Sequence, residues 1–171
     1  ACPAGTDTRG ADAQTSVDYC LPCPAGAATA GDGVACAACP VNTYADAATA
    51  CALCPNATST NGQASRSDVS ACLPCGPGKT SAAGSDCASC PAGTYEAAGV
   101  CVPCDTGTYS SVVGATSASV CTACPAHTHT DGDGATTVTD CVCDAGYFGS
   151  TAPAAGGCKA CAGNCDANAR C

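Results

Sequence analysis

Eight Cys-x-x-Cys pairs run along this chain and constrain its fold more than any other feature. They begin at Cys20, Cys36, Cys51, Cys72, Cys87, Cys101, Cys121 and Cys158, and a tighter Cys141-Val142-Cys143 pair fills the remaining gap. Because the spacing recurs, the sequence is an internal repeat whose unit is the loop between successive pairs. From Cys2 onward the loops span 18, 13, 12, 18, 12, 11, 17, 17 and 15 residues, so the order long, short, short occurs twice.

The apolar residues are too small to build one compact core. The 46% hydrophobic fraction consists mainly of 38 alanines and 21 cysteines, with one Phe and no Trp or Met. Burying a Leu or Phe contributes roughly 1.5–3 kcal/mol, whereas ordering each residue costs about 1–2 kcal/mol of backbone entropy. A disulfide that closes a loop of about 15 residues contributes roughly 3 kcal/mol in the chain-entropy model. We therefore expect small disulfide-rich repeats: an elongated rod of stacked, cysteine-stapled loops with short β-hairpins, little or no helix and no single hydrophobic core.

The loops share an opening phrase, Cys-Pro-Ala-Gly-Thr-Tyr, which is complete at residues 90–95. Proline presets φ and glycine permits a positive φ, so the phrase predicts a turn followed by a short strand that starts at Thr-Tyr. Dipeptides such as Asn61-Gly62 predict the reversal at the loop tip. No segment between cysteines has a sustained apolar period of 3.6 residues, so helix is not expected. Each loop is thus predicted to contain a turn, a strand, a tip and a second strand.

Sequence alone does not fix disulfide connectivity, but the recurrence of similar loop lengths favours local closure. This rule joins the second cysteine of one pair to the first of the next and gives Cys2–Cys20, Cys23–Cys36, Cys39–Cys51, Cys54–Cys72, Cys75–Cys87, Cys90–Cys101, Cys104–Cys121, Cys124–Cys141 and Cys143–Cys158. By loop length we divide the chain into a first group of cysteine-rich repeats at 1–71, a second group at 72–120 and longer repeats at 121–158.

The cysteine content and one N-glycosylation sequon, Asn56-Ala57-Thr58, indicate an extracellular, secreted or cell-surface protein. No stretch approaches the roughly 20 apolar residues of a membrane span, and no signal peptide precedes Ala1, as expected of a mature chain or an excised fragment. A net charge of −9 with five basic residues leaves no basic patch for nucleic acid or an anionic membrane. The expected partners are copies of the chain or neighbouring coat or filament proteins, with N-linked sugar on Asn56 and O-linked sugar on loop Ser and Thr.

Three patterns have the spacing of a reactive or metal site. Cys20-Leu21-Pro22-Cys23 and the similar pairs that begin at Cys72 and Cys101 have the spacing of a redox dithiol. No βαβ context places them at a helix N-terminus, however. Successive pairs also match zinc-knuckle spacing, which the secretory features oppose. His127-Thr128-His129 and Asp131-Gly132-Asp133-Gly134 could hold a cation, yet the sibling loop has an ordinary Asn61-Gly62 tip there. We therefore expect structural disulfides, with no catalytic residue, cofactor or metal.

The opening phrase, a loop of 11 to 18 residues and another Cys-x-x-Cys together resemble ephrin-receptor-like, or GCC2/GCC3, cysteine-rich repeats over about residues 2–158. Related patterns occur in tumour-necrosis-factor-receptor-like repeats, in ciliate immobilisation antigens and in cysteine-rich filament proteins of protists. Loops that open at Cys75 and Cys124 depart from the phrase and lack its Tyr. The resemblance implies a non-catalytic, extracellular structural protein of a surface coat or filament, or alternatively the ligand-binding ectodomain of a receptor-like surface protein.

The C-terminal end resembles EGF-like modules. Residues 141–149 look like the tail of such a module, and 159–171 like the start of a truncated one. In that family the first and third cysteines pair, which implies Cys161–Cys171 and leaves Cys165 unpaired within the chain. An inter-chain bridge through Cys165 is the other explanation for the odd number of cysteines.

Overall fold

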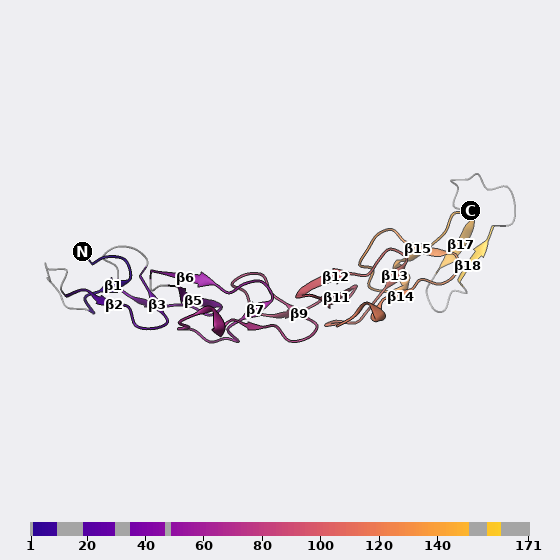
Figure 1. The fold of residues 1–171 in the computed structure, drawn as a ribbon. Coiled ribbons are helices and arrows are strands. Elements are labelled where there is room, and N and C mark those ends of the chain that lie inside the picture. The colour runs from indigo at the N-terminus through magenta and orange to yellow at the C-terminus, as the bar shows by residue number, and fades with distance from the viewer. Residues whose placement is uncertain (1, 10–18, 30–34, 47–48, 151–156, 162–171) are drawn as a thin grey trace. The chain divides into compact units, whose positions relative to one another are not determined.

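In this computed structural model, residues 2–9, 19–29, 35–46, 49–150 and 157–161 are described. Within them the backbone forms short strands that pair as nine two-stranded sheets, each made by strands adjacent in sequence (Figure 1). The hairpins are β1 (Thr6–Asp7) with β2 (Leu21–Pro22), β3 (Ala27–Ala28) with β4 (Ala37–Ala38), β5 (Thr43–Asp46) with β6 (Ala50–Leu53), β7 (Thr58–Ser59) with β8 (Leu73–Pro74), β9 (Lys79–Thr80) with β10 (Ala88–Ser89), β11 (Thr94–Ala97) with β12 (Val100–Pro103), β13 (Thr108–Tyr109) with β14 (Thr122–Ala123), β15 (Thr128–Thr130) with β16 (Cys141–Cys143), and β17 (Tyr147–Ser150) with β18 (Gly157–Ala160).

Disulfides close the loops, with Cα–Cα distances of 5.5 to 5.9 Å. We number the loops in chain order: loop 1 (Cys2–Cys20), loop 2 (Cys23–Cys36), loop 3 (Cys39–Cys51), loop 4 (Cys54–Cys72), loop 5 (Cys75–Cys87), loop 6 (Cys90–Cys101), loop 7 (Cys104–Cys121), loop 8 (Cys124–Cys141) and loop 9 (Cys143–Cys158). Cys161 is also disulfide-bonded. Cys165 and Cys171 lie outside the described residues.

A turn at the opening phrase starts every hairpin. Its third residue after the opening cysteine has a positive φ in all nine loops, at Gly5, Gly26, Asn42, Ala57, Gly78, Gly93, Gly107, His127 and Gly146. Glycine adopts this conformation without steric cost. In the turn of loop 6, for example, the N–H of Thr94 donates to the carbonyl of Pro91 at 3.2 Å, and the Thr94 hydroxyl donates to the same carbonyl at 2.7 Å. The hairpins therefore form where the sequence predicts a turn.

Cysteine and small polar residues occupy the interior in place of large apolar side chains. Cys39, Cys54, Cys90 and Cys104 have no exposed surface, whereas Leu53 and Val113 are 58% and 64% exposed. The described residues include three single-turn 3₁₀ helices, η2 (Val69–Ala71), η3 (Ala118–Val120) and η4 (Val138–Asp140). The fold class expected from the sequence is confirmed: cysteine-stapled loops with short hairpins and very little helix.

The chain divides into two compact units. One comprises Ala1–Gly76 with Thr80–Ala88, and the other Pro77–Lys79 with Ser89–Cys171. Loops 1 to 4 and most of loop 5 therefore belong to the first unit, and loops 6 to 9 to the second. No helix long and apolar enough to cross a membrane is present in the described part of the chain.

Candidate functional site: the interface between neighbouring loops

At four junctions, the tip of one loop hydrogen-bonds to the opening cysteine of the loop before it. The backbone N–H groups of Ser65, Gly84, Gly114 and Gly134 donate to the carbonyls of Cys39, Cys54, Cys90 and Cys104 at 2.8, 3.0, 2.7 and 2.8 Å. All four donors have positive φ. The accepting cysteines are the four with no exposed surface. The tip of each following loop thus covers a disulfide, and the stabilising contacts pass between neighbouring loops, as in other repeat proteins.

A buried Ser or Thr ties neighbouring loops together at the same four junctions and between loops 1 and 2. It is the sixth residue after the opening cysteine, at Thr29, Thr60, Ser81, Ser110 and Thr130, and each is 2 to 6% exposed. The threonine hydroxyl oxygens accept the N–H of the preceding loop's turn: Thr29 from Gly5, Thr60 from Asn42 and Thr130 from Gly107, at 2.8 to 2.9 Å. The serines use their backbone carbonyls, Ser81 for Ala57 and Ser110 for Gly93.

Sequence reasoning missed this set of hydroxyls. Their signal is a recurring Ser or Thr at one offset from the opening cysteine, which is hidden among the many Ser and Thr of the loops. Buried polar groups require hydrogen-bond partners. These residues are therefore part of the interior and not sites for sugar.

The tips of loops 4, 7 and 8 add a third, parallel segment to the hairpin of the preceding loop. The bridges pair Tyr44 with Arg66, Tyr95 with Ala115, and Tyr109 with Ala135. In each, the N–H that follows the tyrosine donates to the tip carbonyl: Ala45 to Arg66, Glu96 to Ala115, and Ser110 to Ala135, at 2.8 to 3.0 Å. Among loops 2 to 9, loops 4, 7 and 8 are those with separations of 17 or 18 residues. Their extra length therefore builds the bridge.

The long tips also reach the opening turn two loops back. A Cβ at Gly26, Gly78 or Gly93 would overlap the carbonyl oxygen of Ser65, Gly114 or Gly134, respectively. A Cβ at Gly107 or Gly146 would meet nothing within 4 Å. The glycine of the opening phrase thus has two reasons to occur. Positive φ applies in every loop, and close backbone approach applies where the loop two further along is long.

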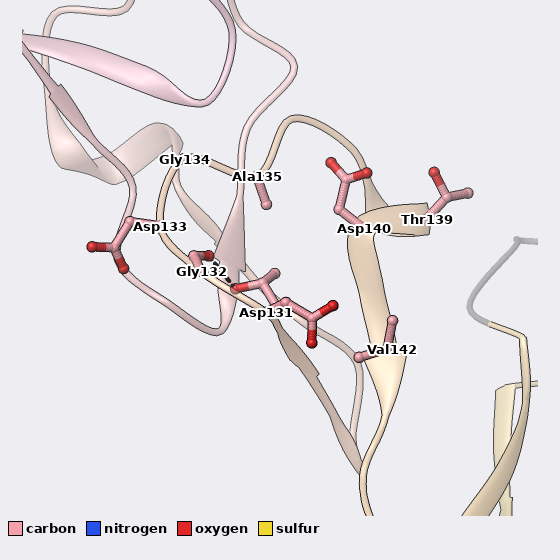
Figure 2. Close-up of a pocket in the computed structure, with 9 residues that line it drawn as sticks. Asp131, Gly132, Asp133, Gly134, Ala135, Thr139, Asp140 and Val142 are labelled. Atoms are coloured by element: carbon pink, nitrogen blue, oxygen red, sulfur yellow. Dashed lines mark hydrogen bonds between the residues drawn. The ribbon is translucent and has the colours of Figure 1, made fainter. Parts of the chain in front are cut away.

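Loop 8 has an open pocket of about 390 Å³ at its tip, lined by three carboxylates (Figure 2). Asp133 accepts the hydroxyl and N–H of Thr106 at 2.6 and 2.8 Å, and these bonds, the hydroxyl first, lower the pKa of Asp133. Backbone N–H groups of Thr137 and then Thr136 lower the pKa of Asp140. Figure 2 shows Asp133 directed away from Asp131 and Asp140. Two of the three carboxylates therefore brace the protein itself.

The two histidines connect loop 8 to the start of loop 9. The ring of His127 stacks on Tyr147 with centroids 4.0 Å apart. His129 Nδ1 lies 2.8 Å from Asp144 Oδ1, and its Nε2 lies 3.9 Å from Asp131. Within the described residues no group of three or more His, Cys, Asp or Glu is arranged to hold a metal ion. The side chains of the possible cation motif are thus divided between contacts with loop 7 and with loop 9.

The sequon residue lies at a junction between loops. Asn56 is exposed, and its Oδ1 accepts the N–H of Ala83 at 2.8 Å. Because the oxygen makes this bond, the amide nitrogen that a sugar would occupy takes no part in it. The Cys-x-x-Cys pairs that could be redox dithiols or zinc knuckles contribute their cysteines to disulfides in the described part of the chain.

Comparison with known proteins points to one family over part of the chain. No curated protein matches the sequence. One family model matches a segment that starts in the opening turn of loop 6 and ends at the closing cysteine of loop 8, so the match covers three successive loops. Residues 93–141 match the model of the tyrosine-protein kinase ephrin type A/B receptor-like family, and this segment is an extracellular type of cysteine-rich module.

Proposed function

We propose that the chain is a non-catalytic structural protein outside the cell, where it forms part of a surface coat or filament. The observation that carries this proposal is the loop-to-loop bonding: buried hydroxyls, serine carbonyls and cysteine carbonyls join neighbouring loops at five junctions of the described chain. Disulfides of this density persist in oxidising surroundings. A chain stabilised in this way needs no large core and suits a spacing or covering role.

Self-association is the property that tests the structural role. Secreted chain is examined by sedimentation velocity over a hundredfold range of concentration, and the material is imaged by negative-stain electron microscopy. Formation of regular fibres or sheets that dissolve on dilution supports the proposal. A chain that stays monomeric at every concentration, and forms no ordered material with its native surface proteins, overturns it.

A ligand-binding ectodomain is the second candidate, and the match of residues 93–141 to an ephrin-receptor-like family favours it. In this case a soluble 1–171 protein would bind saturably to intact cells that carry its ligand. Self-assembly without saturable binding excludes this alternative, and the reverse pattern excludes the coat.

Glycosylation at Asn56 accompanies either role. Treatment with peptide N-glycosidase should lower the mass of the secreted protein and convert Asn56 to Asp. Thr58→Ala should abolish the sugar, and Thr58→Ser should retain it, while both leave Asn56 able to accept the N–H of Ala83. Unmodified Asn56 in the wild-type protein would contradict the assignment.

A further inference from the structure

The disulfide of loop 5 has hydroxyl groups at both of its sulfurs. Ser81 Oγ lies 3.6 Å from Cys75 Sγ, and Ser59 Oγ lies 3.4 Å from Cys87 Sγ. Both serines are buried, at 6% and 2% exposure. Within the described part of the chain, this is the disulfide with a hydroxyl at hydrogen-bond distance from each sulfur.

The same disulfide is less covered than its neighbours. Cys75 and Cys87 are both partly exposed. By contrast, Cys54 of loop 4 and Cys90 of loop 6 have no exposed surface, because the tip of the following loop covers each of them. Both cysteines of loop 5 are therefore open to an external thiolate, whereas in each adjoining loop only the closing cysteine, Cys72 or Cys101, is partly exposed.

Thiol–disulfide exchange requires access to one sulfur and a stabilised leaving thiolate at the other. Ser81 donates its hydroxyl to the carbonyl of Thr58 at 2.9 Å, so its proton is already engaged. Ser59 makes only long contacts of 3.3 Å, with Asn61. Its proton can therefore turn to a negative charge on Cys87 Sγ. The arrangement favours attack on Cys75 and departure of Cys87.

We propose that Cys75–Cys87 is a thiol-exchange site whose co-reactant is a small external thiol. The external thiolate attacks Cys75 Sγ and forms a mixed disulfide, while the Cys75–Cys87 bond breaks and its electron pair leaves on Cys87 Sγ. The Ser59 hydroxyl donates to that thiolate. A second external thiolate then attacks the external sulfur of the mixed disulfide and releases the oxidised thiol, and Cys75 is left as a thiolate that takes a proton from water. The proposal does not depend on the coat or receptor role.

Reduction at this site opens one loop and leaves the others closed. Loop 5 is held to loops 3 and 4 by bonds from Asn42 to Asp86, Ala83 to Asn56, Ala57 to Ser81 and Gly84 to Cys54. Loops 3 and 4 keep their own disulfides. The opened state is therefore a protein with a local change confined to residues 75–87.

Partial reduction tests the site in the unaltered protein. The secreted chain is exposed to limiting glutathione or dithiothreitol, quenched with N-ethylmaleimide at successive times, and mapped by mass spectrometry. We expect Cys75–Cys87 to be reduced at least about tenfold faster than Cys54–Cys72, in keeping with the dependence of exchange on access and leaving group. Equal rates, or a slower Cys75–Cys87, would overturn the proposal. Cys23–Cys36, whose cysteines are also both partly exposed, is the control for exposure alone and should lag behind.

The role of Ser59 is tested by two measurements, the rate of disulfide reduction and the pKa of the Cys87 thiol. A serine with a purely structural role would not change that pKa. Ser59→Ala should slow reduction of Cys75–Cys87 about fivefold, the factor expected for one net hydrogen bond. In Cys75→Ser protein, the rate of alkylation against pH gives the pKa of the free Cys87 thiol, and adding Ser59→Ala should raise that pKa. Ser85→Ala, at an exposed serine of the same loop, should change neither value. An unchanged pKa, or faster reduction of the Ser59→Ala protein, would show that the hydroxyl has no part in the exchange.

Discussion

Loops 3–5 and loops 6–8 are two versions of one arrangement that differ mainly in the third loop. In both series, the first loop has four-residue strands and the tip of the second bridges to it. Loop 5 then closes over 12 residues, whereas loop 8 closes over 17. The extra residues let the tip of loop 8 bridge to Tyr109 and approach Gly93.

The difference determines which residue can occupy the first opening turn. In the second series this residue is Gly93, because a Cβ would overlap the carbonyl of Gly134. In the first series it is Asn42, which is 4% exposed. Its side chain accepts the N–H of Thr60 and donates to Asp86. A side chain thus fills the space that a longer third loop would take, so the residue at one turn depends on the length of a loop far along the chain.

Complete reduction of the disulfides should have the largest effect on stability. It should unfold loops 3–5 and loops 6–8 alike. Non-reducing peptide mapping of the native chain should first give one cystine per loop in both. After reduction and alkylation, loss of roughly 3 kcal/mol per loop should leave neither series folded, because the large apolar side chains are too few to replace the disulfides. Hydrogen exchange measures this. Protection that persists in one series would show that it has another source of stability.

Gly93→Ala should be, with Gly26→Ala and Gly78→Ala, among the most damaging single substitutions in the opening turns. The alanine is strained at positive φ and also overlaps the carbonyl of Gly134, so we expect a loss of about 3 kcal/mol in the free energy of unfolding. Gly107→Ala is the matched control. It has the same φ range and open space around it, and should lose about 1 kcal/mol. Denaturant unfolding compares the two, and equal losses would contradict the close-approach argument.

Removing a buried hydroxyl should weaken each series to a similar, intermediate extent. Thr60→Val and Thr130→Val each leave a turn N–H without its acceptor and should cost about 1–3 kcal/mol. Faster hydrogen exchange at the amides of Asn42 and Gly107 would report the loss directly. Thr128→Val, which removes a partly exposed hydroxyl, should have a smaller effect. If Thr128→Val is as damaging, burial is not the cause.

Acid should produce the smallest effect. It should weaken the contact between loops 7 and 8 and leave the contact between loops 4 and 5 unchanged. The loop 7–loop 8 brace uses the carboxylate of Asp133, whose pKa is lowered by the Thr106 hydroxyl and N–H. Its contribution is therefore present above the ordinary carboxyl pKa near 4 and is lost as pH falls through the lower folded value. The loop 4–loop 5 brace uses the neutral amide of Asn56. Hydrogen exchange should thus show acid loosening at the Thr106 amide and not at Ala83, and Asp133→Asn should abolish the pH dependence.

Local rules explain what could be predicted. Cysteine spacing and turn residues act within one loop, so the stapled hairpins and the turn at each opening phrase follow from neighbouring residues. The interface is different, because its partners are remote in sequence. Asn42 bonds to Thr60 across 18 residues and to Asp86 across 44. No local pattern identifies these partners.

The sequence by itself determined a chain of small disulfide-closed hairpins, because sparse large apolar residues leave sulfur as the source of stability and Pro or Gly in the opening phrase favours a turn. The tertiary structure alone decided how each loop contacts its neighbours. Those contacts depend on which backbone groups meet when a long tip folds back over earlier turns. Because the two partners of each inter-loop hydrogen bond belong to different loops, up to 44 residues apart, residue identity could not reveal them.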